Sequence, residues 1–440
     1  MGSYVPSTAE QRSLMLKAVG VPSFEALYRD VPENMRLEEG ALNIPSGISE
    51  MELRAFMQAT SDKNKVFDAI FRGAGSYSHY IPSIVKRVTS KEEFVTAYTP
   101  YQSEISQGIL QSIFEYQTMI CELTGMDASN ASVYDGASAA AEAAAMCHDR
   151  KRFKVLVSGA SHPNTIKVIK TYCLGSGAEC AVVPAKNGKT DLDALKNALD
   201  DTTSCVYAQQ PSFSGMLEDC KAIADIAHTA GAKFIMGINP IAAAIVKTPA
   251  ECGADIAVGE GQPLGIPMSF GGPYLGFMAC VEKMQRKLPG RIVGQTSDSE
   301  GRRCFVLTLQ AREQHIRREK ASSNICSNEA LCALTASVYM AAMGPRGMRD
   351  VAEACFANAH YLAERITALP GFDLVNSGEF FHEFVTSSPI CPEKLMSALE
   401  EKNILGGLPV EGRILWCATE MNTAEQIETL VSVIKEAVVR

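Results

Sequence analysis

The sequence predicts an α/β protein in three parts: a helical N-terminal arm over 1–70, a large α/β domain over 71–315 and a small C-terminal α+β domain over 316–440. Three observations predict this fold class. The 440 residues exceed what one compact core usually supports. Short apolar, strand-like runs alternate with helical segments through the middle of the chain, and long helices with a few short strand-like runs follow.

The first part of the chain is predicted to be helical. The segment 9–19 follows Ser7 and Thr8, and the segment 50–60 follows Ser49, which are residue types that cap helix N-termini. The aromatic and glycine-rich stretch 71–83 is predicted to be a loop, and YTPYQSEISQG at 98–108 leads into a long helix that ends at Gly125.

The large domain is predicted to hold a mostly parallel sheet. Its buried strands are expected at 154–160, 178–185, 202–210, 232–239, 254–261 and 276–282. Helical segments separate most of these runs, which is typical of a doubly wound sheet covered on both faces. In the C-terminal domain, strands are expected at 372–378, 380–387 and 413–419, with Trp416 in the core.

Composition excludes several classes of partner. A net charge of -9 leaves no basic surplus to neutralise phosphates, so nucleic acids and anionic membranes are not expected. The 14 cysteines include no CxxC pair, which predicts reduced thiols and no metal site. The chain starts without a signal-peptide pattern and has no apolar run of about 20 residues, so a cytoplasmic protein is expected.

Two motifs predict a phosphate-binding crevice at one edge of the sheet. Gly136 and Ser138 begin an alanine-rich helix after a strand-like stretch, where free backbone N–H groups and the helix dipole attract anions. A small-residue helix start also serves close packing. His162 follows one strand later, at a strand end where open α/β sheets bind ligands. In pyridoxal phosphate (PLP) enzymes of this topology, such a residue stacks on the cofactor ring.

The two groups that PLP chemistry requires are missing from their expected places. A carboxylate should hold the pyridine nitrogen protonated, but the strand 232–239 offers Met236, Gly237 and Asn239. A lysine should bind the cofactor covalently, but the turn after the next strand offers Gln262. Lys247 lies between these strands and is expected to point to solvent. We therefore interpret Gly136, Ser138 and His162 as a vestigial pocket that binds no cofactor.

Four strings carry a resemblance to a known family: YVPSTAEQRSLMLKAVGV, YTPYQSEISQG, VGEGQPLGIPMSFGGP and TLQAREQHIRREKASSNIC. They resemble the glycine cleavage system P-protein, and within it the chains that match its N-terminal half, known as subunit 1 of glycine dehydrogenase (decarboxylating). The resemblance runs from about residue 4 to the C-terminus. It implies the fold of type I PLP-dependent transferases, and alignment on Ile266 and Pro267 puts Gln262 at or beside the PLP-lysine position. Asn239-Pro240 departs from the Asp-Pro that such chains often have.

The resemblance also implies partners and an activity. PLP is expected on a companion subunit, in a two-plus-two heterotetramer, and lipoate on the H-protein. The complex would decarboxylate glycine and transfer the aminomethyl group to the lipoyl arm. Loop residues of this chain are then candidates to complete the companion's active site: Tyr77, Ser78, His79, Tyr98 and Tyr101. An equally good interpretation is that the tyrosine rings are buried at the subunit interface, with their hydroxyls hydrogen-bonded to the backbone.

Two other interpretations of the whole chain stay open, and the charged run near residue 315 also has two interpretations. A free-standing PLP aminotransferase or desulfurase would use Lys247, and a non-catalytic scaffold would only hold the PLP-bearing subunit. The charged run around Arg312, His315 and Arg317 fits either a solvated helix face or a contact with the H-protein or the companion chain.

Overall fold

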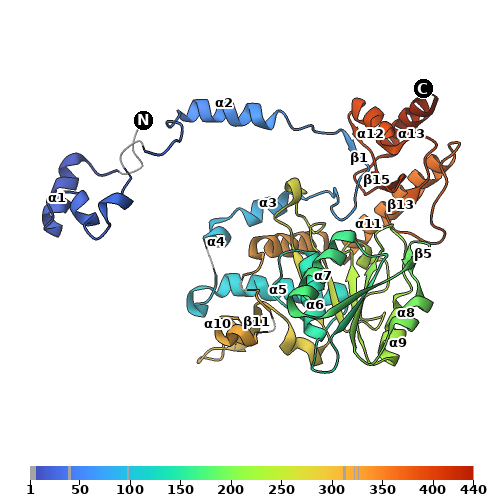
Figure 1. The fold of residues 1–440 in the computed structure, drawn as a ribbon, viewed down its shortest axis with the longest axis horizontal. Coiled ribbons are helices and arrows are strands. Elements are labelled where there is room, and N and C mark those ends of the chain that lie inside the picture. The colour runs from blue at the N-terminus through green and yellow to red at the C-terminus, as the bar shows by residue number, and fades with distance from the viewer. Residues whose placement is uncertain are drawn as a thin grey trace. The chain divides into compact units, whose positions relative to one another are not determined.

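The computed structural model describes residues 6–37, 41–96, 99–310, 314–321, 323–325 and 327–439. The chain divides into two units, 1–66 and 67–440. Figure 1 shows the elements of each unit. The three-part division predicted from the sequence, with a boundary near 316, stays a prediction.

In its described residues, 6–37 and 41–66, the first unit has two α-helices and two short 3-10 helices: α1 (Ala9–Val19), η1 (Glu25–Tyr28), η2 (Glu33–Met35) and α2 (Glu50–Ser61). Thr8 and Ser49 cap α1 and α2 through capping boxes with Gln11 and Glu52, so the predicted capping positions are confirmed. Neither α-helix buries a residue. The helices of this unit therefore rest on local capping and propensity, without a core of their own.

The second unit is built on a seven-stranded sheet with the order β2-β10-β9-β8-β7-β3-β4. The strands are β2 (Ala128–Ser129), β3 (Lys154–Ser158), β4 (Glu179–Val183), β7 (Thr203–Gln210), β8 (Lys233–Ile238), β9 (Ile256–Glu260) and β10 (Gly276–Cys280). The five strands from β9 to β4 are parallel, and β10 runs antiparallel to β9 and β2. All six predicted strands of this domain are present, and the mostly parallel sheet is confirmed.

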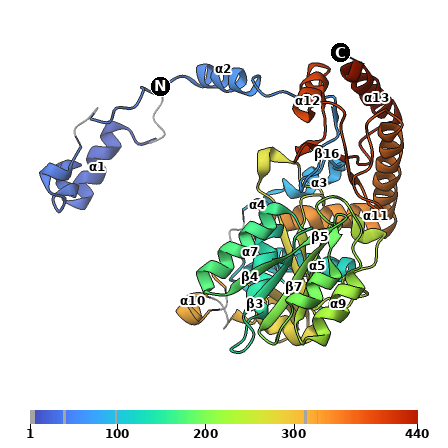
Figure 2. The same ribbon diagram turned by 45° about the vertical axis from the view of Figure 1, so that its right-hand side comes forward.

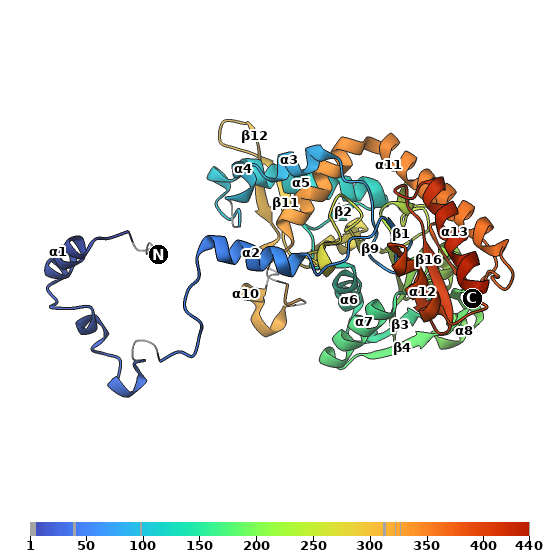
Figure 3. The same cartoon turned by 90° about the horizontal axis from the view of Figure 1, so that it is seen from above.

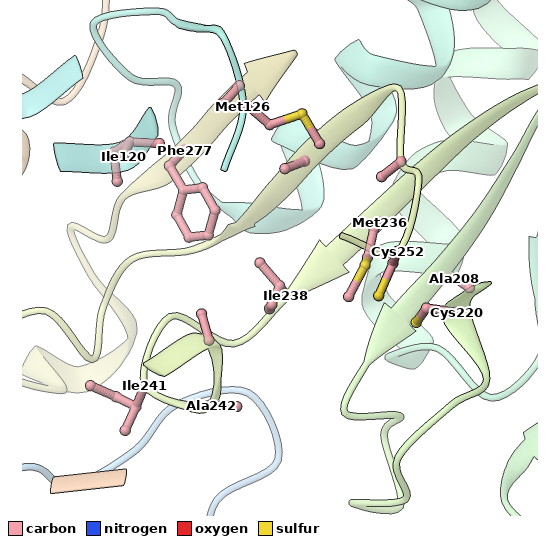
Figure 4. Close-up of a cluster of buried hydrophobic side chains, with 14 of the residues drawn as sticks. Ile120, Met126, Ala208, Cys220, Met236, Ile238, Ile241, Ala242, Cys252 and Phe277 are labelled. Atoms are coloured by element: carbon pink, nitrogen blue, oxygen red, sulfur yellow. The ribbon is translucent and has the colours of Figure 1, made fainter. Parts of the chain in front are cut away.

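Side chains of successive strand residues enter two different cores, as the two-residue period of a strand requires. Val155 and Val157 pack with α6 (Gly136–Cys147) and α7 (Pro163–Ser176) on one face. Leu156 packs on the other face, with α5 (Gln107–Thr124), α9 (Cys220–Thr229) and α11 (Ala330–Thr367). Figure 3 shows α5 and α11 on one side of the sheet and α6 and α7 on the other. Figure 4 shows part of the second core, where Met236 of β8 lies beside Cys252 and Ile238 of the same strand lies nearer to Phe277.

A separate three-stranded sheet, β13-β16-β15, carries the C-terminal segment. It consists of β13 (Glu383–Thr386), β16 (Arg413–Cys417) and β15 (Leu408–Val410), and its core includes Trp416 and residues of α12 (Pro392–Glu401) and α13 (Ala424–Val439). The strand predicted at 372–378 is wrong, because this stretch makes only a single bridge from Leu374 to Thr386. Figure 2 shows the long helix α11 running beside α13.

The remaining elements connect these parts. They are β1 (Ala69–Ile70), α3 (Ser83–Thr89), α4 (Glu92–Val95), η3 (Ser103–Ile105), β5 (Ala185–Lys186), β6 (Lys189–Thr190), α8 (Leu192–Ala198), η4 (Ala242–Ala244), η5 (Ser269–Gly271), η6 (Glu282–Lys287), β11 (Ile292–Ser297), β12 (Arg303–Thr308), α10 (Gln314–Arg317), η8 (Arg318–Lys320) and β14 (Ile404–Leu405). The strand β1 pairs in parallel with β14, so the start of the second unit is joined to its C-terminal part. The loop 73–82 follows β1. Hydrogen bonds join it to Gln262, beyond the end of β9, and to Glu383 of β13.

Candidate functional site

A pocket of about 690 Å³ lies at the carboxyl ends of the parallel strands. The loop after β1, the start of α6, the start of α7 and the ends of β7, β8 and β9 supply most of its lining. The strand order places this pocket where open α/β sheets bind their ligands. The structure brings several predicted residues together here, namely Tyr77, Gly136, His162, Gly237 and Asn239.

His162 holds the loop after β1 against the pocket wall. Its Nδ1 accepts a hydrogen bond from the Asn164 backbone N–H at 3.1 Å, so Nε2 carries the proton and donates to the Ala74 carbonyl at 3.0 Å. Burial lowers the pKa of this imidazole, which keeps it neutral. A side chain at Gly75 would come within 2.9 Å of Nε2, so the loop approaches the ring closely.

Gln262 does not reach into the pocket. Its side-chain amide accepts from the Tyr77 backbone N–H at 2.9 Å and donates to the carbonyls of Tyr77 at 3.0 Å and Ile266 at 2.7 Å. The residue is 1% exposed. The side chain, predicted to stand at or beside the PLP-lysine position, therefore has a structural role that links the β9 turn to the loop after β1.

Asn239 lines the pocket beyond the end of β8, at the place of the expected pyridine carboxylate. Its Oδ1 accepts hydrogen bonds from the backbone N–H groups of Ile241 at 2.9 Å and Ala242 at 3.1 Å. The amide is therefore engaged in capping the turn that follows, and it carries no charge that could stabilise a protonated ring nitrogen.

Glu260 is a residue of the site that sequence reasoning missed. It ends β9, and its Oε2 accepts the Gly136 backbone N–H at 2.9 Å at the start of α6. Burial raises the pKa of this carboxyl to about 7, although three backbone N–H groups act in the opposite direction. The signal for it was an acidic residue directly after an apolar strand, which is where ligand-facing side chains stand.

Tyr207 and Gln209, on β7, also line the pocket. Gln209 accepts the His162 backbone N–H through Oε1 at 2.9 Å. Burial raises the pKa of Tyr207, so its hydroxyl stays protonated. Ser138 is not among the lining residues; its backbone N–H donates to Asp135 Oδ1 at 2.7 Å as part of the α6 cap.

The candidate loop residues divide into buried and accessible ones. Tyr77 and His79 are buried, and their side chains bond to carboxylates of the C-terminal segment: Tyr77 donates to Glu383 at 2.8 Å, and His79 Nδ1 lies 2.8 Å from Glu420. Ser78 is partly buried, and its carbonyl accepts the Thr419 hydroxyl at 2.7 Å.

Tyr101 is 60% exposed, and its hydroxyl accepts a hydrogen bond from Arg291 at 2.7 Å. Tyr98 and Arg312 lie outside the described residues, so the structure gives no place for them.

His79, Cys355 and Glu420 bring three potential metal-binding atoms within 4.8 Å of one another. Hydrogen bonds account for this arrangement, because the Glu420 carboxylate accepts from the Cys355 thiol at 3.2 Å and from the Tyr80 backbone N–H at 2.7 Å, besides its pairing with His79. The cluster fastens the loop after β1 to the C-terminal segment.

The lysines and thiols that the sequence singled out lie away from this pocket. Lys247 is exposed and is not among the lining residues, whereas Lys167 of α7 is the one lysine among them. The described cysteines are all free thiols, and most are buried. Among the residues that the structure describes, no helix has both the length and the hydropathy to cross a membrane.

Comparison with known proteins gives a consistent result. The family model described as glycine cleavage system P-protein matches residues 2–434. The chain is 51% identical over 439 residues to a probable glycine dehydrogenase (decarboxylating) subunit 1 of Desulforamulus reducens, which covers 98% of each chain.

Solved structures agree with this. A crystal structure of glycine decarboxylase (P-protein) of the glycine cleavage system, in inhibitor-bound form, superposes with a TM-score of 0.94 at 40% identity, over 99% of this chain and 100% of that one. A glutamate decarboxylase of Lactobacillus brevis shares the fold, with a TM-score of 0.69 at 13% identity over 92% of this chain and 96% of that one. The predicted type I PLP-enzyme fold is confirmed.

Proposed function

Because the chain belongs to the glycine cleavage system P-protein family, we propose that it is the subunit of glycine dehydrogenase (decarboxylating) that holds no PLP. In this proposal a companion subunit carries PLP, and the two chains form a two-plus-two heterotetramer in the cytoplasm. The complex decarboxylates glycine and passes the aminomethyl group to the lipoyl arm of the H-protein. PLP, when bound in the companion, supplies the electron sink for this reaction.

The observation that carries the proposal is that the residues of the pocket do not fit PLP. Gln262 stands at the lysine position with its amide bonded to backbone groups, and Asn239 stands at the pyridine-carboxylate position with its oxygen bonded to a turn. At the phosphate position, Glu260 accepts the N–H that begins α6. Each of the three groups that would fix the cofactor is thus replaced by one that is engaged within the chain.

The loop residues enter the proposal in two roles. Tyr101 and Ser78 are accessible enough to contact a companion chain, whereas Tyr77 and His79 would act by positioning the loop 73–82. Loops of this kind complete sites by holding donors in a water-poor cleft, where one donor contributes about 2.7–4 kcal/mol to the transition state.

The alternative of a free-standing PLP enzyme has less support. Lys247, the lysine it would use, is exposed and does not line the pocket. A non-catalytic scaffold is the second candidate. Hydrogen bonds to its own chain hold the loop after β1 in place, and a loop fixed in this way can present a surface for assembly without supplying a catalytic group.

The test is reconstitution of glycine–carbon dioxide exchange with H-protein and PLP. We expect each separated chain to be inactive and the mixture to be active. Tyr101→Phe, which keeps the ring and removes the hydroxyl, is expected to lower turnover of the complex by at least about tenfold with assembly unchanged. Normal turnover with Tyr101→Phe would favour the scaffold, and exchange by this chain alone would reject the proposal.

A further inference from the structure

The start of α6 has the geometry of an anion site. This helix of 12 residues begins at Gly136, beside the ends of β9 and β10, and its first turn faces the pocket. Free N–H groups and the positive end of the dipole make such a helix start attractive to phosphates.

Two carboxylates of the chain already accept backbone N–H groups at this helix start. Glu260 Oε2 accepts the Gly136 N–H at 2.9 Å, and Asp135 Oδ1 accepts the Ser138 N–H at 2.7 Å. The other oxygen of Glu260 accepts the backbone N–H groups of Gln262 at 3.0 Å and Leu275 at 3.2 Å. Donors from three segments thus converge on one carboxylate, as they would on a bound anion.

Packing fixes Glu260 in this place. A Cβ at Gly136 would come within 2.7 Å of the Glu260 backbone nitrogen, so α6 and the end of β9 are in close contact. The backbone of Glu260 therefore lies directly against the helix start, and an incoming phosphate would meet both the volume and the charge of its side chain there. Like charges in such close contact repel strongly, because the low effective dielectric constant of a buried site weakens the screening between them.

We propose that Glu260, with Asp135, takes the place of a phosphate group at the α6 N-terminus and so excludes phosphate esters, PLP among them, from this pocket. The proposal rests on the proposed function and names the residue that sets the pocket's specificity. A ligand group at this end of the pocket would have to donate hydrogen bonds or carry positive charge, because Asp135 lines it with a carboxylate.

Replacing Glu260 by serine is the direct test, since serine removes the charge and opens the space. The protein is the assembled complex with its companion chain saturated with PLP, at pH 8, which is above the pKa of about 7 of the Glu260 carboxyl. Inorganic phosphate is the probe, measured by isothermal titration calorimetry. We expect Glu260→Ser to bind phosphate at least about tenfold more tightly than the unaltered complex, equivalent to about 1.4 kcal/mol. Glu401→Ser, at an exposed position at the end of α12, should bind as the unaltered complex does.

A crystal of the unaltered complex soaked in phosphate provides a second measurement that does not depend on the variant folding. Phosphate bound at the Gly136 N–H with Glu260 displaced would overturn the proposal, as would folded Glu260→Ser with unchanged phosphate affinity. Both results are independent of exchange activity, so a failure here is distinguishable from a failure of the proposed function.

Discussion

Glu383 begins β13 in a buried position and accepts two hydrogen bonds, from the Tyr77 hydroxyl at 2.8 Å and from the Ala74 backbone N–H at 2.6 Å. Burial raises the pKa of its carboxyl from 4.5 to about 7, because the charged form is poorly solvated there. The neutral form is thus favoured in the folded state. Its contribution to stability is complete below about pH 4.5 and is lost as the pH rises through about 7.

Glu383→Gln is therefore expected to reduce the loss of stability between pH 6 and pH 8 by about 1 kcal/mol, because glutamine stays neutral over this range. The measurement is urea unfolding at a series of pH values. Glu379→Gln, at an exposed position four residues earlier, is the control and should follow the unaltered chain. Equal pH dependence in all three proteins would show that Glu383 does not titrate in this range.

The sequence was sufficient to predict the pocket residues whose places follow from strand ends and motif alignment. Gly136, His162 and Asn239 belong to this class, whereas the side chain of Gln262 does not line the pocket. Glu260 was not predicted, because its role depends on the distance between α6 and β9, which only tertiary packing sets. Tyr77 and His79 were predicted as candidates to complete the companion's active site. Both are buried within their own chain, bonded to carboxylates that lie more than 300 residues further along the sequence and could not be foreseen from it.

At the scale of elements, the turn after β7 is fastened to β13. Gly215 has φ of +86°, and a Cβ there would overlap the backbone carbonyl of Glu383. Its own carbonyl accepts the Phe381 N–H at 3.0 Å. Both the left-handed backbone and the close approach therefore require glycine at this position.

Gly215→Ala is expected to cost on the order of 3 kcal/mol, because strain and overlap add. Gly177→Ala is the matched control: its φ is +74°, but a Cβ there would meet nothing within 4 Å, so about 1 kcal/mol is expected. The measurement is the thermal unfolding midpoint of each variant in the complex. Equal destabilisation by the two substitutions would mean that the contact with Glu383 contributes nothing.

The hairpin of β11 and β12 shows where sequence patterns were insufficient. Six residue pairs join its strands, from Ile292 with Thr308 to Ser297 with Arg303, and a polar turn connects them. Val293 and Phe305 on its inner face pack against α5. Of the six residues of β11 only Ile292 and Val293 are apolar, so this strand lacks the apolar run that identified the central strands. By contrast, the helix ending at Gly125 was predictable from its long apolar face and from the glycine that follows it. That glycine adopts the left-handed φ of +71° that is typical of a helix C-cap.

At the scale of the whole molecule, the second unit combines two cores about one seven-stranded sheet with a third core around Trp416. Strand periodicity predicted the first two, because each parallel strand is apolar on both faces. The fastening of the loop after β1 to the C-terminal segment was not predictable, since it joins residues distant in sequence through single polar pairs such as Tyr77 with Glu383. In the function proposed above, such a pocket keeps the PLP-enzyme fold while the positions predicted to fix the cofactor serve internal contacts.

The most direct test of this account is to find which chain of the assembled complex holds PLP. The complex is saturated with PLP, reduced with borohydride, separated into its chains and digested for mass spectrometry. The account predicts a pyridoxyl-modified lysine on the companion chain and none on this chain, with one cofactor for each pair of chains. A stoichiometric pyridoxyl group on Lys167, Lys247 or any other lysine of this chain would contradict it.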